Sequence, residues 1–398
     1  MHSSYSNIFS ILQYSLFPSV HDSEEVSQDA DWSFIYQEMQ DQTVSALAFP
    51  WLEKHAIPDP ELQQKWMTSC LQQQAKWMQI MYEQTQLINL MEQNNIPCVI
   101  IKGSAAMMSY PHPRFRTAGD IDFLVKRTDF DEATRILIDN NYTPGSDLDI
   151  GKHHISFAKN NISFELHQRL AIINETDERL LSLFEDGIEN RVWHTIVDNR
   201  FPSLPDDLNG LVLLFHINQH LREGIGLRQI IDWMMYIYKY NNLNDILPVI
   251  RTTGMEKLAI TVTIMCQKYL GLPSLIEESD EYPYDELMEY IITSGNFGKK
   301  KDEEEKTATV LLKIANPLLF FRRLQKGGLR RWETAEKYRI LRPFAWIYQI
   351  GFYIRMLFTD KNTSKTVTKS RKKATNQLNL IHKLGLDVDK SIKKHKNC

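Results

Sequence analysis

The stretch IIKGS at residues 100–104, followed by GDIDFLV at residues 119–125, determines how this chain folds. The first part is an apolar run that ends in a glycine-serine turn, and the second is an apolar strand interrupted by two aspartates. Burying an unpaired carboxylate is costly, so acids inside an apolar strand need a reason to be there. Because side chains alternate along a strand, we expect Asp120 and Asp122 to share one face and the apolar residues between them to enter the core.

Two carboxylates about 7 Å apart on one face of a strand can share hard divalent cations. A third acid, Glu165, lies between apolar residues in a later candidate strand. Such an arrangement is what metal-assisted transfer of a nucleotide needs. The alternative is that the aspartates are helix caps or surface residues and that Glu165 faces solvent on a half-covered sheet.

The pattern resembles the polymerase-β-type nucleotidyltransferase superfamily, which has a Gly-Ser turn, an Asp-x-Asp strand and a third acidic strand residue. It is most similar to an uncharacterised bacterial nucleotidyltransferase family within that group. The resemblance covers roughly residues 30–270 and leaves the last third of the chain unexplained. The matching positions are Lys102-Gly103-Ser104, Tyr110-Pro111, Arg116, residues 119–125, Glu165-Leu166-His167, and His216, His220, Arg228 and Asp232.

The resemblance implies an enzyme that moves a nucleoside monophosphate from an NTP, such as ATP, to an acceptor and releases pyrophosphate. Asp120, Asp122 and Glu165 would be the catalytic and metal-binding residues. Oxygen ligands and a site open to substrate phosphates favour Mg²⁺, with Mn²⁺ as the alternative, over zinc.

The nucleotide-binding residues implied by the resemblance are Lys102, Gly103, Ser104, Arg116 and His167. Glycine lets the backbone approach a phosphate closely, and the N–H groups at the start of the next helix favour an anion. The spacing from Ser104 to Asp120 is longer than in the most familiar superfamily members. Lys102 and Arg116 are cationic candidates for the triphosphate, or else solvated surface charges.

Other polar residues have simpler interpretations. His153, His154, His216 and His220 are expected to be structural histidines, because no third zinc ligand accompanies the i, i+4 pair. Arg228 and Asp232 are also four residues apart, which predicts a pair on one helix.

The order of elements predicts an α+β fold, a small mixed nucleotidyltransferase sheet with helices on one face, flanked by N-terminal and C-terminal helical regions. Expected domains are an N-terminal helical region at 1–94, a catalytic core at 95–200, a helical domain at 201–295 and a basic helical region with a mobile tail at 296–398. Expected helices span residues 63–93, 104–109, 129–141, 206–221, 227–240, 245–253, 256–270, 309–321 and 332–358. Expected strands span residues 98–101, 119–125, 154–159 and 162–168, the last two joined by a tight turn at Asn160-Asn161.

The composition is typical of a soluble globular protein, with 43% hydrophobic and 24% charged residues. The four cysteines are widely spaced and contain no metal motif, which favours a reducing cytoplasm. Residues 343–358 make a poor membrane span because Gln349 and Arg355 interrupt them.

Charge is distributed unevenly along the chain. Residues 296–398 hold 25 of the 46 Lys and Arg but only 9 of the 50 Asp and Glu, so they carry net +16 and residues 1–295 carry −20. A basic end predicts an anionic partner, either a membrane surface, which would make the protein peripheral to a membrane, or RNA. The alternative is that this region packs on the acidic body or is solvated.

These observations leave three functional hypotheses open. The first is an enzyme whose acceptor is a small molecule, a saccharide, a protein or RNA. The second is a regulatory or partner-binding module with little or no turnover. The third is an RNA-directed nucleotidyltransferase that uses the basic end as an electrostatic track.

Overall fold

The computed structural model describes residues 3–17, 26–145, 153–170, 173, 177–221, 224–240, 243–296, 300, 324–325, 328, 332, 334, 339–351 and 375–386. By its contacts the chain divides into two compact units, residues 1–297 and residues 298–398.

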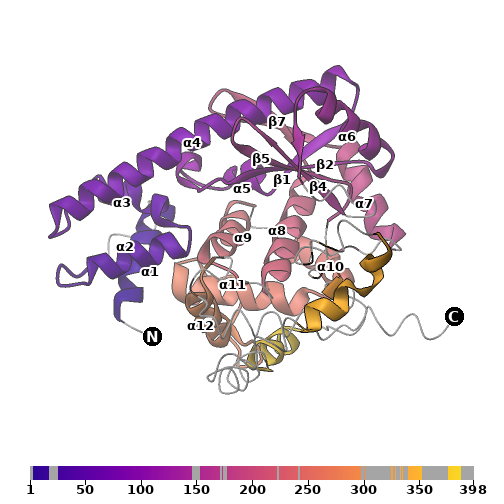
Figure 1. The fold of residues 1–398 in the computed structure, drawn as a ribbon. Coiled ribbons are helices and arrows are strands. Elements are labelled where there is room, and N and C mark those ends of the chain that lie inside the picture. The colour runs from indigo at the N-terminus through magenta and orange to yellow at the C-terminus, as the bar shows by residue number, and fades with distance from the viewer. Residues whose placement is uncertain are drawn as a thin grey trace. The chain divides into compact units, whose positions relative to one another are not determined.

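A seven-stranded mixed sheet lies at the centre of the first unit, with strand order β3-β4-β5-β2-β1-β7-β6 (Figure 1). Its strands are β1 Cys98–Ile101, β2 Asp120–Val125, β3 Thr143–Pro144, β4 His154–Lys159, β5 Ile162–His167, β6 Val192–Ile196 and β7 Asn199–Ser203. The pairs β2–β5 and β1–β7 are parallel and the other neighbours are antiparallel. The expected α+β class with a mixed sheet is confirmed.

The β4–β5 hairpin forms at the expected dipeptide. Asn160 and Asn161 both have positive φ, at 51° and 61°. Two consecutive residues of positive φ match the twist of the flanking strands, and asparagine tolerates this conformation. The two-residue turn fixes the register, so His154 pairs with His167.

One face of the sheet is covered by α4 (Pro60–Gln93) and α6 (Phe130–Asp139). The Asp59 carboxylate accepts a hydrogen bond from the Leu62 N–H and caps α4, which begins at a proline as helices commonly do. Trp77, Ile80 and Met81 of α4 join the core that Ile121, Phe123 and Val125 enter from β2. Asp120 and Asp122 alternate with those core residues and therefore point away from α4.

The first unit contains ten further helices among its described residues. They are α1 Ser3–Leu16, α2 Trp32–Asp41, α3 Phe49–Leu52, α5 Gly103–Met107, α7 Glu178–Glu189, α8 Asp206–His220, α9 Leu227–Tyr240, α10 Leu243–Thr253, α11 Glu256–Leu270 and α12 Tyr284–Ser294, with short 3-10 turns at Ser45–Ala48, Pro113–Phe115 and Arg127–Asp129. Figure 1 shows α4 on one side of the sheet and α8 and α9 on the other. The helices expected at 227–240 and 256–270 have the predicted bounds.

The sequence interpretation missed the hairpin of β6 and β7. It ended the catalytic core at residue 200, whereas β7 continues to Ser203, and Pro202 within it pairs with Trp193. Proline is rare within sheets because it cannot donate a hydrogen bond. Here β7 pairs with β1 only at Ser203, so β1 needs no hydrogen bond from the backbone of Pro202.

The second unit is described in part. It contains a 3-10 turn, η5 Arg339–Phe344, which continues as helix to residue 351, and a helix at residues 375–383. The expected helix at 309–321 and most of the one at 332–358 lie outside the described residues. Among the residues that the structure describes, no helix has the length and apolarity to cross a membrane.

A buried ion pair joins the loop before β2 to α9. The Arg116 guanidinium donates to both Asp232 oxygens, at 3.0 Å from Nε and 2.7 Å from Nη2. The Tyr110 hydroxyl donates to the same carboxylate at 2.7 Å. The side chains of Arg116 and Asp232 are only 2% and 1% exposed, so their charges depend on each other.

Asp232→Ala should therefore destabilise the protein strongly, by about 3–5 kcal/mol, because it leaves the Arg116 charge buried without its partner. Chemical denaturation followed by circular dichroism measures this. Asp139→Ala is the matched control, since it removes one end of an exposed pair with Arg135 and should change stability little. Equal effects of the two substitutions would contradict the importance of the buried pair.

Candidate active site

Two neighbouring parallel strands bring a pair of acids together. In the register of β2 and β5, Asp122 pairs with Glu165 and Asp120 pairs with Ser163. Residues paired across parallel strands share a face, and His167 follows Glu165 by two residues. Asp122, Glu165 and His167 therefore project from the face of the sheet that α4 does not cover.

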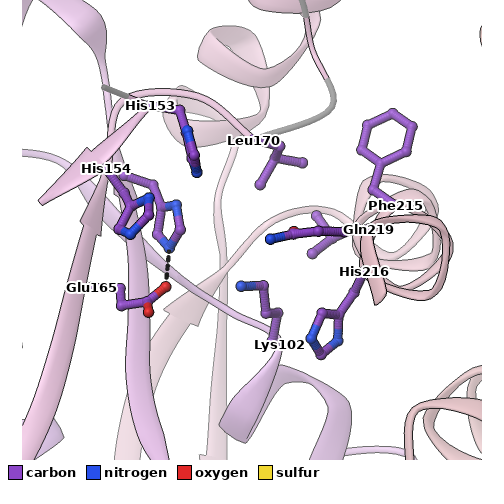
Figure 2. A pocket seen from close by; sticks show the side chains of 10 residues that line it. Lys102, His153, His154, Glu165, Leu170, Phe215, His216 and Gln219 are labelled. Carbon is purple, nitrogen blue, oxygen red and sulfur yellow. Dashed lines mark ion pairs between the residues drawn. The ribbon is translucent and has the colours of Figure 1, made fainter. Parts of the chain in front are cut away.

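These three side chains form a tight cluster. His167 Nε2 lies 2.9 Å from Asp122 Oδ1 and 3.4 Å from Glu165 Oε2, the second contact being the dashed line in Figure 2. One ligand atom from each residue lies within 4.8 Å of the others. Two carboxylates and an imidazole at this spacing are a suitable donor set for one divalent cation.

Lys102 supplies the positive charge beside this cluster. Its Nζ donates to Asp122 Oδ1 at 2.7 Å. Its backbone has φ of 56°, which is uncommon for a residue other than glycine, at the turn between β1 and α5. Strained backbone of this kind persists only where surrounding structure holds it, and here the Asp122 contact holds the side chain.

The charges of the cluster depend on one another. Burial raises the pKa of Asp122, but the Lys102 ammonium and the hydrogen bond from His167 outweigh burial and hold that pKa well below its ordinary value. Burial lowers the pKa of His167, but hydrogen bonds to Asp122 and Glu165 outweigh it and raise the pKa. Asp122 is therefore held as a carboxylate, and a proton on His167 is stabilised.

Asp120 lies at the edge of this group. It is half-buried, and its carboxylate is not among the three clustered ligand atoms. Burial, together with the charges of Asp122 and Glu165, raises its pKa. An additional cation near Asp120 would relieve this repulsion.

The Gly-Ser turn begins α5, as expected. A Cβ at Gly103 would lie 3.8 Å from the Asp120 carbonyl oxygen, so the turn passes close to the start of β2. The Ser104 hydroxyl is buried and donates to Gln84 Oε1 of α4 at 2.7 Å. Its hydroxyl is thus occupied within the fold, and a role at a phosphate stays a prediction.

Arg116 and Arg228 have different partners from those that the sequence predicted. Asp232 accepts from Arg116 rather than pairing with Arg228 on α9, so the predicted helix pair is wrong. Arg228 donates from Nη1 to the Thr117 carbonyl at 3.5 Å, and its buried Nε has no hydrogen-bond partner in the structure. Burial and the neighbouring Arg116 charge lower the pKa of Arg228, while the charge of Arg228 counters the raised pKa of Asp120.

A cavity of about 90 Å³ adjoins the cluster, between the β4–β5 hairpin and α8. Figure 2 shows His153, Lys102 and Gln219 pointing into it from different elements. The cavity is lined by Lys102, His153, His154, Glu165, His167, Leu170, Val212, Phe215, His216 and Gln219. We call this space the α8 cavity.

Three of the histidines expected to be structural line the α8 cavity. Burial lowers the pKa of His153 to about 3 and that of His216 well below its ordinary value, so both are neutral near pH 7. His154 Nδ1 is buried without a hydrogen-bond partner. The sequence contained a signal for this, because the two-residue turn at Asn160-Asn161 places His154 opposite His167.

Comparison with protein families gives the class of the chain. A sequence model of the family described as "Uncharacterised nucleotidyltransferase" matches residues 28–271. The chain belongs to this nucleotidyltransferase family. A search of curated proteins finds no significant match. The family match spans the sheet, the Asp122–Glu165–His167 cluster and α8 to α11, and membership of the family implies a nucleotide substrate.

The raised pKa of His167 should make the stability of the metal-free protein depend on pH. The protonated imidazole contributes stability that is fully present below the ordinary pKa of about 6.5 and is lost as pH rises through the higher folded pKa. We expect His167→Gln to remove that pH-dependent loss. The difference in unfolding free energy between the wild type and His167→Gln should therefore shrink from pH 6 to pH 9 in the presence of a chelator.

His153→Gln is the control, because the sign is opposite for a histidine whose pKa is lowered. Wild-type protein loses stability as pH falls below about 6.5, where unfolded His153 takes up a proton, and the substitution should lessen that loss. Denaturant titrations across the pH range measure both effects. If the unfolding free energies of the wild type and His167→Gln changed in parallel with pH, the claim that His167 holds a proton between Asp122 and Glu165 would be contradicted.

Proposed function

We propose that the protein transfers a nucleoside monophosphate from an NTP to an acceptor hydroxyl and releases pyrophosphate. The observation that carries this proposal is the register of Asp122 with Glu165 on adjacent parallel strands, inside a chain that belongs to a nucleotidyltransferase family. These two acids lie side by side on one face of the sheet, on interior strands, one of which neighbours the strand that leads into the Gly-Ser turn.

The divalent cation in this proposal is Mg²⁺, or alternatively Mn²⁺. Asp122, Glu165 and His167 would hold it. Asp120 interacts electrostatically with Asp122 and Glu165 and would add negative charge beside the cation. The cation would neutralise charge on the triphosphate and leaving pyrophosphate and lower the pKa of the acceptor hydroxyl. The two carboxylate ligands suit both ions.

The cationic side chains have distinct roles in the proposal. Lys102 is hydrogen-bonded to Asp122 and adds positive charge beside the Gly103 turn, where the triphosphate would lie. Arg116 donates to Asp232, so we assign it a structural role and not contact with the triphosphate. Arg228 has a buried Nε without a partner and a charge that reaches Asp120, so we assign it to the triphosphate.

The proton and the leaving group complete the reaction. The acceptor oxygen bonds to the α-phosphorus, the bond between that phosphorus and the oxygen bridging to the β-phosphate breaks, and pyrophosphate leaves. The Glu165 side chain is 27% exposed, the most open of the three clustered residues, so we assign it the proton of the acceptor hydroxyl.

The direct test is incubation of the protein with each α-labelled NTP, Mg²⁺ or Mn²⁺, and a fractionated cell extract. We expect one nucleotide to give pyrophosphate and to label a fraction of the extract. Absence of divalent-dependent binding of any NTP would contradict the proposal.

Asp122→Asn should keep the fold and weaken divalent-dependent NTP binding by about 100-fold or more, because an anionic ligand is replaced by a neutral one of the same shape. Titration calorimetry with Mn²⁺ and NTP measures the loss. The matched control is Asp139→Asn, at an exposed position of α6, which should bind as the wild type does. Wild-type affinity in the Asp122 variant would rule out the assigned cluster.

Arg228→Met should raise the Kd for NTP by about tenfold, equivalent to roughly 1.4 kcal/mol, because a cation facing the triphosphate is lost. Arg228→Lys should recover part of the affinity, since it retains the charge but not the fork of donors. An unchanged Kd in the methionine variant, with a normal unfolding curve, would place Arg228 outside the nucleotide site.

A further inference from the structure

The α8 cavity lies beside the clustered acids and is built from two separate parts of the chain. His153, His154 and Glu165 line it from the β4–β5 hairpin, and His216 and Gln219 line it from α8. Figure 2 shows the Gln219 amide and the Lys102 ammonium directed into the same space. A molecule in the cavity would therefore contact Glu165 directly.

The cavity offers hydrogen bonds that the protein does not use itself. His154 Nδ1 and His167 Nδ1 are buried, line or adjoin this space, and have no hydrogen-bond partner in the structure. Leaving buried polar atoms unpaired is unfavourable, so a ligand that pairs with them gains that interaction. A hydroxyl group can donate to one such nitrogen and accept from another.

The charges of the described lining residues disfavour an anionic occupant. Lys102 is the one lysine or arginine among them, and its ammonium is bound to Asp122. The proton stabilised on His167 lies between the carboxylates of Asp122 and Glu165. The imidazoles of His153 and His216 are neutral, as described above. Glu165 would repel a phosphate or carboxylate placed against it.

We propose that the α8 cavity binds the acceptor, and that the acceptor is a small uncharged molecule bearing several hydroxyl groups, such as a polyol or a simple sugar. This inference rests on the proposed function and narrows its acceptor. One hydroxyl contacts Glu165, which takes its proton as the oxygen bonds to the α-phosphorus and pyrophosphate leaves. Neighbouring hydroxyls bond to His154 and Gln219, and the apolar sides of Val212 and Phe215 cover the carbon skeleton.

The test uses the full chain and two panels of probes. The uncharged panel contains glycerol, myo-inositol, ribose and glucose, and the anionic panel contains glycerol 3-phosphate, ribose 5-phosphate and glucose 6-phosphate. Saturation-transfer NMR measures binding to the nucleotide-free protein, and pyrophosphate release from NTP with Mg²⁺ or Mn²⁺ measures stimulation. We expect at least one uncharged probe to bind and to stimulate release, and its phosphorylated counterpart to do neither.

Gln219→Trp tests whether the probe occupies this cavity. Gln219 is exposed at the cavity wall, so a larger ring should be tolerated by the fold and should block entry. We expect the bound probe and the stimulated release to be lost while the Kd for NTP stays within about twofold of wild type. Gln72→Trp, at an exposed position of α4, is the matched control and should retain both.

The outcomes separate this inference from the proposed function. NTP binding without binding of any uncharged probe, stimulation by the anionic panel alone, or full stimulation in Gln219→Trp would each overturn the inference and leave the proposed function standing. Failure to bind NTP with a divalent cation would overturn the proposed function.

Discussion

The carboxylate of Asp122 is the group on which the site depends. It is 3% exposed within a core strand, where an unpaired charge would be very unfavourable. Lys102 and His167 both hydrogen-bond to one of its oxygens and keep it ionised. The lowered pKa of Asp122 follows from these two contacts, and the turn at Lys102 and the register of β2 with β5 place the two partners beside it.

A second buried carboxylate connects the site to the helices. Asp232 on α9 binds Arg116, whose loop leads into β2, so the position of the aspartate strand is tied to α9. Arg228 lies in the first turn of the same helix, and its charge interacts electrostatically with Asp120. The helical region thus contributes both to the support of the site and to its electrostatics, and α8 supplies one wall of the adjoining cavity.

Local patterns in the sequence predicted the centre of the fold. Alternation of acids with apolar residues in β2 gave the faces of the strand, and Asn160-Asn161 gave the hairpin. The pairing of His154 with His167 was implied by that turn but was not predicted. The partner of Asp232 was not predictable in this way, because Arg116 lies 116 residues away and the nearer Arg228 offered a plausible helix pair. Pro202 concealed β7 for a similar reason, since proline usually marks a boundary and only the pairing of β7 with β6 makes it a strand residue.

The central claim is that Asp122, Glu165 and His167 together hold a divalent cation beside a nucleotide. The most direct measurement is a crystal structure of the protein with Mn²⁺ and a non-hydrolysable NTP analogue, with anomalous scattering used to locate the ion. The account predicts an anomalous peak bound by atoms of all three residues, with the triphosphate next to it. A well-ordered Mn²⁺ and nucleotide elsewhere in the molecule, with the His167–Asp122 hydrogen bond intact, would contradict it.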